Sequence, residues 1–376
     1  MHTMRAVLPI AVAAVAAVAL CGSAALAANL GVTPAGCDTA RAGAGGFDPG
    51  RLYAALTEFQ GGPANLHGLV IERRGASVAE CYRSGKDRSV YSLLRHKVDF
   101  DAVTRHDLRS ISKSVTSLLW GIALAEGKVA PLDARVLDLL PELADLKTAG
   151  RQDITIAHLL DMRSGLAWNE AGGYGVRNPE FGLYWRGKQA RYVFDRPMAA
   201  PAGQRFSYNG GGTAVLAALL EKGVGMPLQE YARERLFAPL GITDWEWLTD
   251  FRGRPLAFAG LRMRPQDLAR LGQLMLQHGR WNGTQIVPAA WVEASLEPHI
   301  DTGDGLQYGY QWWHGKAQAL GGEQAWTAAF GNGGQRLFVV PGLDLVVVMT
   351  AGMYDDEAGA IRVNRLFRQI AAAVER

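Results

Sequence analysis

Two side chains that could carry out nucleophilic chemistry stand three positions apart in the segment TRHDLRSISKSVTSLLWGIALAEGK. They are Ser110 and Lys113, and residues at this spacing lie on one face of a helix. A serine hydroxyl is a weak nucleophile unless a base within hydrogen-bond reach takes its proton, and an amine can be that base. The pair therefore predicts a serine nucleophile, Ser110, whose base is Lys113.

The helix behind this pair strengthens the prediction. The spacing alone proves little, because roughly one S-x-x-K is expected by chance in a chain of this length. After Lys113, however, the segment SVTSLLWGIALA is apolar nearly all round, as in a helix buried in a core. A lysine at the head of such a helix is costly unless its charge is paired or neutralised, which favours a catalytic role over a structural one.

Acyl transfer also needs a second group that moves protons and an oxyanion hole, and two further segments could supply them. Tyr208 stands in FSYN, directly before Gly210-Gly211-Gly212 and an Ala/Leu-rich helix. Its phenol could point into a cleft, or it could be a core tyrosine with a bonded hydroxyl. The segment AFGNGGQ, residues 329–335, precedes the strand pattern RLFVVP. Its glycines could bring a backbone N–H close to a ligand, or form only a bulge or turn.

The elements that must position these groups follow from hydrophobic periodicity. Runs rich in β-formers predict strands at both ends of the chain, and helical periodicity dominates between them. We therefore expect an α+β fold, with one antiparallel sheet built from both halves of the chain, flanked by helices, and a mostly helical subdomain at about residues 115–250. A cleft between these layers is the natural place for a site. The predicted strands are 66–73, 77–83, 308–313, 324–329, 335–340 and 343–350, and the predicted helices include 154–162, 213–222, 228–236 and 358–374.

A long connection in the helical half is a candidate substrate loop. The segment WNEAGGYGVRNPEFGLYWRGKQ combines Gly, Pro, Asn and aromatic residues over a length that is unusual for a plain connection. The tryptophans at positions 168, 185, 312 and 313 could wall an apolar pocket, although core packing explains them equally well.

Residues 1–27 have the pattern of a secretory signal peptide. Arg5 gives a positive start, residues 6–20 form an apolar stretch too short to span a membrane comfortably, and Ala25-Leu26-Ala27 is a small-x-small cleavage site. We therefore expect export to the bacterial periplasm or the medium. No stable membrane insertion is expected after cleavage.

The cysteines leave alternatives open. Cys21 raises a lipoprotein alternative, which Leu20 disfavours because a small residue is expected before a lipidated cysteine. Signal cleavage would leave Cys37, within a segment without periodicity at residues 28–48 that we expect to be a flexible arm, and Cys81 in an early strand. In an oxidising compartment these two could form a disulfide or remain unpaired thiols.

Composition and spacing exclude several classes of function. The formal net charge is +3, from 39 basic and 36 acidic residues without blocks, so no nucleic-acid partner is expected. The cysteines form no C-x-x-C pair and the histidines no H-x-x-x-H pair, so no metal or other cofactor is expected. The sequence also has no G-x-S-x-G elbow, no P-loop and no G-x-G-x-x-G after a strand.

The sequence contains three motifs in a fixed order: Ser110-Ile111-Ser112-Lys113, Tyr208-Asn209-Gly210 and Ala329-Phe330-Gly331. These motifs resemble those of the beta-lactamase-related serine hydrolases. That superfamily includes class C beta-lactamases, DD-peptidases, family VIII esterases and 6-aminohexanoate-dimer hydrolases. The segments HDLRSISKSVTSLLWGIA, ITIAHLLDMRSGLAW, RMRPQDLARLGQLML and GNGGQRLFVVPGLDLVVV reinforce the likeness. The resemblance implies a beta-lactamase/transpeptidase-like fold in one domain, residues 49–376.

The resemblance also implies a role for each matching residue. Ser110 would form an acyl-enzyme, Lys113 would deprotonate it, and Tyr208 would pass the proton to the leaving group and help to activate water. The oxyanion hole would be the backbone N–H groups of Ser110 and Asn332. The residues expected to contact the substrate are Tyr174, on a loop over the site, Asn209, Gly331 and Gly333.

Two departures from the family pattern shape the expected activity. The second motif usually reads Y-x-N, but Gly210 replaces the amide; the third usually begins with Lys, His or Trp, but Ala329 stands there. In penicillin-recognising members that third-motif side chain helps to hold the substrate carboxylate, which alanine cannot do. We therefore expect weak or no activity on penicillins and a small ester or amide as the substrate, closer to the 6-aminohexanoate-dimer hydrolases. The alternatives are a penicillin-recognising DD-peptidase or beta-lactamase, and a non-catalytic binding protein on the same scaffold.

Overall fold

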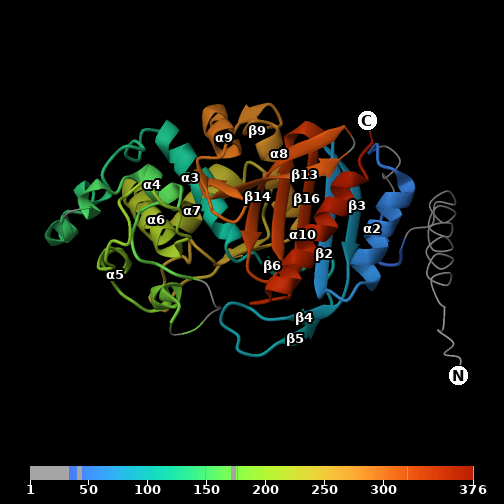
Figure 1. The fold of residues 1–376 in the computed structure, drawn as a ribbon, viewed down its shortest axis with the longest axis horizontal. Coiled ribbons are helices and arrows are strands. Elements are labelled where there is room, and N and C mark those ends of the chain that lie inside the picture. Colours follow the sequence, from blue (N-terminus) through green and yellow to red (C-terminus); the bar gives the residue numbers. More distant parts are fainter. Residues whose placement is uncertain are drawn as a thin grey trace, which may run out of the picture.

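One antiparallel sheet, built from both ends of the chain, is the centre of the fold (Figure 1). The computed structural model describes residues 34–39, 45–148, 150–170, 175, 177–319 and 321–375. Within these residues the main sheet has nine strands in the order β1-β3-β2-β16-β15-β14-β13-β12-β11. The N-terminal β2 (Leu66–Arg73) pairs with the C-terminal β16 (Leu345–Ala351), with Ile71 opposite Val347. The predicted α+β class and the sheet made from both halves of the chain are confirmed.

The remaining elements complete this sheet and cover it. Its other strands are β1 (Cys37–Asp38), β3 (Ala76–Tyr82), β11 (Ile300–Asp301), β12 (Gln307–Gly309), β13 (Trp312–Ala319), β14 (Gly322–Gly331) and β15 (Gln335–Val340). Small sheets join β4 (Gly85–Asp87) to β5 (His96–Val98), β9 (Arg280–Trp281) to β10 (Thr284–Gln285), and β8 (Leu261–Met263) to both β6 (His106–Asp107) and β7 (Trp245–Trp247). The helices are α2 (Pro49–Gly61), α3 (Ile111–Ala125), α4 (Ile156–Leu160), α5 (Gln189–Phe194), α6 (Gly210–Val224), α7 (Leu228–Ala232), α8 (Pro265–Leu276), α9 (Ala289–Leu296) and α10 (Glu357–Ala372). Short helical turns are η2 (Val136–Asp138), η3 (Pro141–Leu146), η4 (Arg151–Asp153), η5 (Pro179–Tyr184), η6 (Arg233–Phe237) and η7 (Pro341–Leu343).

Both faces of the sheet are covered, which explains why its central strands read as continuous apolar runs. Along β16, Leu345, Val347 and Met349 enter the core that the sheet shares with α2 and α10. Val346 and Val348 enter the opposite core, shared with α3, α6 and α8. Successive side chains of a strand point to opposite faces, so the residues from Leu345 to Met349 are all apolar.

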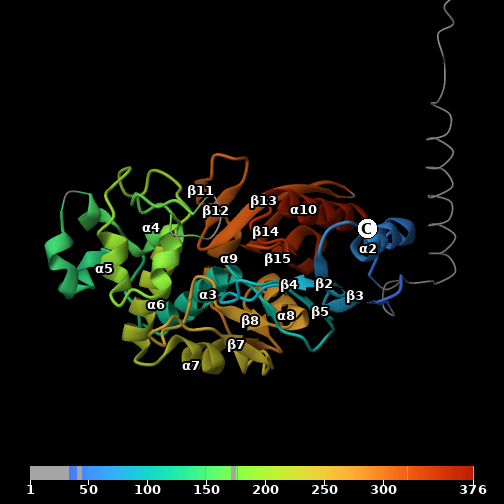
Figure 2. The same ribbon diagram turned by 90° about the horizontal axis from the view of Figure 1, so that it is seen from below.

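The helices of the middle of the chain gather on one side of the sheet. Figures 1 and 2 both show α4, α5, α6 and α7 together there, with α3 between them and the strands. Helix α3 packs against both α6 and β14. The start of α3 is thereby held where the helical half meets the sheet.

The predicted strand at 308–313 is wrong, because a turn divides it. Strand β12 ends at Gly309 and β13 begins at Trp312; between them Tyr310 and Gln311 have φ of 46° and 70°. Positive φ at both central residues is what a tight two-residue hairpin requires, usually with Asn or Gly. Here tertiary contacts hold the turn: Gln311 Oε1 accepts a hydrogen bond from the Thr213 hydroxyl at 2.8 Å, and Gln311 Nε2 donates to two carbonyls of α4.

The N-terminal segment is attached to the rest of the fold at two points. Within the predicted arm, Cys37 and Asp38 form β1 on β3, and Cys37 is disulfide-bonded to Cys81, which faces it in the register. Phe47 bridges to Val374 near the end of α10. The predicted signal peptide lies outside the described residues. Every helix within the described ranges is too short or too polar to cross a membrane.

Candidate active site

Ser110 immediately precedes α3. Arg109 before it adopts a left-handed conformation, with φ of 53°, whereas Ser110 already has helical φ and ψ of −64° and −8°. From Ile111 to Ala123 the helix is buried on all sides, as its apolar sequence predicts. The core therefore holds α3 in place while Ser110 lines a cavity at its N-terminus.

Lys113 is only 1% exposed although it carries a charge. Its Nζ donates to Ser110 Oγ at 2.9 Å and to the Phe258 carbonyl at 3.0 Å. It also lies 3.4 Å from Glu180 Oε2, with which it forms an ion pair. These partners compensate for the hydration that the ammonium loses on burial. The spacing in the sequence thus does bring Ser110 and Lys113 into contact.

Tyr208 joins this pair from the turn before α6. Its phenol lies close enough to Lys113 and Ser110 for both side chains to lower its pKa, and Lys113 Nζ lies 4.9 Å from the centre of its ring. The ring stacks on Trp313 of β13, with 5.6 Å between centroids. Packing against the sheet therefore directs the phenol toward the start of α3.

Burial and charge change the proton affinities of these groups. Burial lowers the pKa of Lys113, but Tyr208 and the Glu180 carboxylate outweigh this and raise it above the usual lysine value. Burial raises the pKa of Tyr208, and the Lys113 charge offsets only part of the rise. Burial, followed by repulsion from Glu180, raises the pKa of Glu170 to about 8. At neutral pH the site therefore holds Lys113 as an ammonium and a second proton on Glu170.

Ser110 and Tyr208 border a cavity of about 1370 Å³ between the helical half and the sheet. Of the four tryptophans considered as pocket walls, Trp168 and Trp313 line it. Trp312 is instead packed in the core next to α3. The cavity therefore has flat apolar walls beside the hydroxyl of Ser110, where a small organic group could lie.

The glycine segment after β14 lines the same cavity, through Gly331, Asn332 and Gly333. A Cβ on Gly331 would lie 2.2 Å from the Leu108 carbonyl oxygen, so only glycine lets the end of β14 approach the chain before α3 this closely. The Asn332 side chain is fixed by Asp355, donating to Oδ1 at 2.8 Å and accepting from its backbone N–H at 2.9 Å. The oxyanion role of the Asn332 N–H stays a prediction.

Asn209 lies away from the cavity. It is 2% exposed and caps α6, with its Oδ1 accepting a hydrogen bond from the Gly212 N–H at 3.1 Å. Tyr174, expected on the loop over the site, lies outside the described residues. Of the expected site residues, the fold thus brings Ser110, Lys113 and Tyr208 together, but leaves Asn209 in a structural position.

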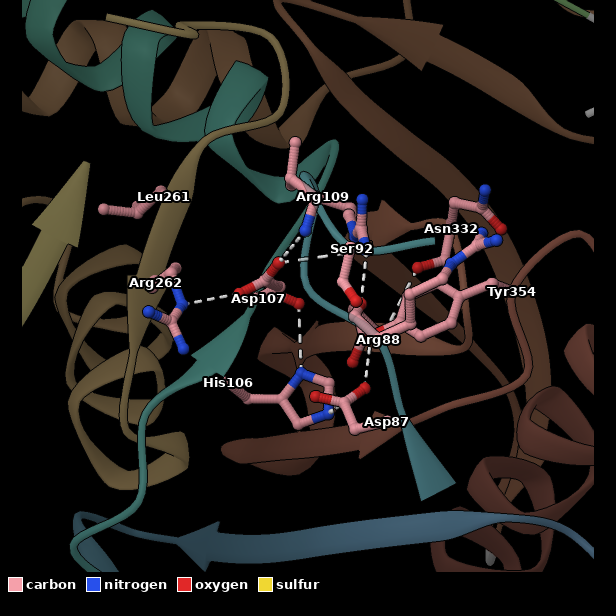
Figure 3. A network of polar contacts seen from close by, with 12 residues as sticks. Asp87, Arg88, Ser92, His106, Asp107, Arg109, Leu261, Arg262, Asn332 and Tyr354 are labelled. Atoms are coloured by element: carbon pink, nitrogen blue, oxygen red, sulfur yellow. Dashed lines mark hydrogen bonds and ion pairs between the residues drawn. The ribbon is translucent and has the colours of Figure 1, made fainter. Parts of the chain in front are cut away.

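A polar network connects Arg109, the residue before Ser110, with Asn332 in the glycine segment after β14 (Figure 3). Arg109 Nη2 donates to the Arg88 carbonyl at 2.6 Å. The Arg88 side chain pairs with Asp355 at 3.3 Å, and Asp355 binds Asn332. Figure 3 shows Arg109 and Asn332 on the same network, with Arg88 near its centre. The residue before Ser110 and the candidate oxyanion residue are therefore positioned by one set of contacts.

Asp87 and His106 belong to this network (Figure 3). Together with His67 they form a cluster whose potential ligand atoms are within 4.8 Å of one another, close enough to surround a metal ion. However, His67 Nδ1 is 2.8 Å from His106 Nε2, which is hydrogen-bond distance, and Asp87 accepts a hydrogen bond from the Tyr354 hydroxyl at 2.6 Å. The three residues come from strands β2, β4 and β6, so spacing along the sequence does not reveal the cluster. The contacts of these residues with one another and with Tyr354 give the cluster a structural role in the network.

Charged residues that line the cavity, among them Glu170, Glu180 and Arg336, were not predicted from the sequence. Glu170 and Glu180 belong to the candidate substrate loop. Arg336 of β15 is buried, which lowers its pKa to about 10, and it donates to the carbonyls of Gly331 and Gln335 at 3.3 and 2.9 Å. The available signal for Arg336 was a charged residue inside an apolar strand pattern, directly after the glycine segment.

The chain matches the family model described as Beta-lactamase over residues 69–368. It is 28% identical over 306 residues to the 6-aminohexanoate-dimer hydrolase of Paenarthrobacter ureafaciens, covering 76% of this chain and 72% of that protein. Two similar solved structures each give a TM-score of 0.65: a penicillin-binding protein homologue from Caulobacter crescentus (17% identity, 85% of this chain and 95% of that chain) and a family VIII carboxylesterase (16% identity, 85% and 96%). The chain therefore belongs to the beta-lactamase family and is a serine hydrolase with a beta-lactamase/transpeptidase-like fold.

Proposed function

We propose that this protein hydrolyses a small ester or amide through an acyl-enzyme on Ser110, with Lys113 as base and Tyr208 as proton shuttle. One observation carries the proposal: Lys113 Nζ donates to Ser110 Oγ at 2.9 Å, and the same Nζ lies 4.9 Å from the centre of the Tyr208 ring. All the groups that a serine nucleophile needs for proton transfer meet at the edge of one cavity.

In acylation, Ser110 Oγ forms a bond to the acyl carbon while its proton passes to the neutral amine of Lys113. The substrate carbonyl becomes an oxyanion, which the N–H groups of Ser110 and Asn332 would stabilise. As the bond to the leaving group breaks, Tyr208 relays the proton from Lys113 to the departing alcohol or amine. Water then attacks the acyl-enzyme and gives up its proton along the same route, and Ser110 regains its proton as the carboxylic acid leaves.

The third motif supports an apolar substrate that has no carboxylate next to its acyl group. Ala329 is fully buried in β14, so this position offers the cavity no polar side chain. Trp168 and Trp313 line the cavity and favour apolar groups. The curated relative is, by its name, a hydrolase of a 6-aminohexanoate dimer, which supports a short chain as the substrate.

The direct test is labelling with a fluorophosphonate probe, together with hydrolysis of p-nitrophenyl butyrate and a panel of amides. We expect the wild type and Ser77→Ala, a serine of β3, to be labelled and Ser110→Ala to remain unlabelled. Equal labelling of wild type and Ser110→Ala would refute the assignment. A folded wild type that hydrolyses neither class of substrate would favour a non-catalytic binding protein.

Arg336 favours a second candidate, a penicillin-recognising DD-peptidase or beta-lactamase. It is a buried cation that lines the cavity, and a guanidinium can pair with the carboxylate of a penicillin. For this candidate a fluorescent penicillin should label the wild type but neither Ser110→Ala nor Arg336→Met. Absence of labelling in the wild type, in a preparation that still hydrolyses esters, would exclude it.

We also propose that the protein is exported, as the pattern of residues 1–27 indicates. The disulfide between Cys37 and Cys81 supports an oxidising compartment. N-terminal sequencing of protein from the periplasm or medium of an expressing bacterium should begin at Ala28. Full-length protein confined to the cytoplasm would contradict export.

A further inference from the structure

Glu170 and Glu180 occupy the space beside Gly210, the residue that stands where the family pattern has an amide side chain. A Cβ on Gly210 would lie 2.5 Å from Glu180 Oε2 and 3.1 Å from Glu170 Oε1. Such distances leave no room for a side chain at this position while the two carboxyls remain in place. The glycine at position 210, which departs from the second motif, and the two acids that fill the space beside it therefore form one structural feature.

Both carboxyls have defined partners around the catalytic amine. Glu170 Oε1 accepts hydrogen bonds from the Gly210 N–H at 2.5 Å and from Trp168 Nε1 at 2.6 Å. Glu180 is 1% exposed, and its Oε2 lies 3.4 Å from Lys113 Nζ. Three tyrosines also interact with the two acids: Tyr184 of η5, Tyr208 in the turn before α6, and Tyr308 of β12.

The charges of this cluster balance only if the two acids keep one proton. Two carboxylates and one ammonium would leave a net negative charge in a buried site, which is costly. Burial and the nearby charge of Glu180 accordingly raise the pKa of Glu170 to about 8. The two acids thus behave as a pair that holds one proton at neutral pH and releases it in mildly alkaline solution.

Lys113 can take the Ser110 proton only as a neutral amine, yet Tyr208 and Glu180 favour its ammonium form. Its own extra proton must therefore move to a neighbour before acylation. Of its contacts, the Phe258 carbonyl does not accept a full proton, whereas the Glu180 carboxylate does. The second carboxyl, Glu170, lies beside Glu180, because an oxygen of each faces the same point next to Gly210, and two carboxyls sharing a site resist being ionised together.

We propose that Glu170 and Glu180 are positioning residues for the Lys113 proton: the pair accepts this proton and so frees the amine to deprotonate Ser110. The inference rests on the function proposed above. In the step, one proton moves from Lys113 Nζ to Glu180, and the hydroxyl proton of Ser110 moves to Nζ as Oγ bonds to the acyl carbon. That second proton then leaves through Tyr208 with the departing group, and the pair returns its proton to Lys113 after turnover.

This arrangement has a definite pH dependence. Below about pH 8 the cluster holds two protons, one on Lys113 and one on the pair, and a pair that already has a proton accepts a second one poorly. Above that pH the cluster holds one proton, which the doubly ionised pair can accept. The rate of Ser110 acylation should therefore rise as pH increases through about 8.

The test compares wild type, Glu170→Gln, Glu180→Gln and the control Glu230→Gln, an exposed residue of α7. Rates of fluorophosphonate labelling and kcat/KM for p-nitrophenyl butyrate are measured from about pH 6 to about pH 10. Wild type and control should show the rise near pH 8. Glu170→Gln keeps an oxygen that can accept from Gly210 and Trp168 but cannot hold the proton, so it should lose the rise and be about tenfold or more slower at alkaline pH. Glu180→Gln should show the same loss.

Four results separate the possible failures. A folded Glu170→Gln with the wild-type rate and pH profile would overturn the inference, as would a uniform loss of rate with the rise near pH 8 retained, because that pattern indicates a structural role. Equal labelling of wild type and Ser110→Ala would refute the proposed function and this inference with it. Independently of activity, the infrared absorption of a protonated carboxyl should disappear from the wild type as pH rises through about 8 and be missing from Glu170→Gln; its persistence in that variant would also contradict the pair.

Discussion

Lys113 and Glu180 form an ion pair that is almost completely enclosed: Nζ lies 3.4 Å from Oε2, and the two side chains are 1% and 2% exposed. They stand 67 positions apart in the sequence, on α3 and η5. The same Nζ donates to Ser110. A single contact therefore links the packing of the helical half to the proton transfer at the nucleophile.

Substitution of Lys113 should affect stability and activity together. Lys113→Met leaves Glu180 buried without its cation, so the free energy of unfolding should fall by about 3–5 kcal/mol, and the loss of the base should lower kcat/KM by about 10²–10⁴-fold. Chemical denaturation and ester hydrolysis measure the two effects. The double variant Lys113→Met with Glu180→Gln should regain much of the stability but none of the activity; a stable single variant would contradict the ion pair.

Removal of the Tyr208 hydroxyl should lower the activity and leave the stability of the protein almost unchanged. Tyr208→Phe keeps the ring that stacks on Trp313, so the free energy of unfolding should change by only about 1 kcal/mol. The proton relay is lost, and kcat should fall by about 10²-fold. Steady-state kinetics and thermal denaturation check this expectation. Wild-type kcat in a folded variant would remove Tyr208 from the mechanism.

The close approach at Gly331 should tolerate no side chain. In Gly331→Ala the new methyl group would meet the Leu108 carbonyl oxygen at 2.2 Å, so β14 and the start of α3 must separate. We expect fluorophosphonate labelling to slow by about tenfold or more, since small displacements of catalytic groups cost large factors in rate. Gly61→Ala is the matched control, because a Cβ there meets nothing within 4 Å. Equal labelling rates for both variants would show that this spacing does not affect the site.

The Glu170 carboxyl should make stability depend on pH in a known direction. In the folded protein it keeps its proton up to about pH 8, whereas the unfolded chain releases it near the ordinary value of 4.5. Between these values the unfolded state binds fewer protons, so stability falls as pH rises. The free energy of unfolding of wild type, relative to Glu170→Gln, should therefore decrease from about pH 5 to about pH 8 and level off above. A difference that is constant with pH would show that Glu170 has an ordinary proton affinity.

The disulfide should contribute to stability without affecting the chemistry. It links residues 44 positions apart, and a cross-link closing a loop of that length stabilises a protein by about 4 kcal/mol through the entropy of the unfolded chain. Cys37→Ser with Cys81→Ser should therefore unfold at lower denaturant concentration than wild type. Its kcat/KM below the unfolding transition should stay unchanged, and a large loss of kcat/KM would show that the N-terminal strand supports the site.

Local geometry explains how much could be predicted from the sequence. Ser110 and Lys113 meet because residues three apart in a helix share a face whatever surrounds them. Strands β2 and β15 were predicted at their observed bounds, since apolar runs of that length between turn signals fit strands covered on both sides. The resemblance of three ordered motifs supplied the family, which the match over residues 69–368 confirms.

Contacts between remote segments were decided only by the tertiary structure. Gly210 departs from the family motif in the sequence, but nothing local shows that Glu170 and Glu180 fill the space beside it. Tyr310 and Gln311 carry no turn signal, and the hairpin there exists because Gln311 binds partners on α4 and α6. Hydrophobic periodicity is a property of residues that are neighbours in the sequence. The burial, ion pairs and proton affinity of a side chain depend instead on which distant segments pack around it.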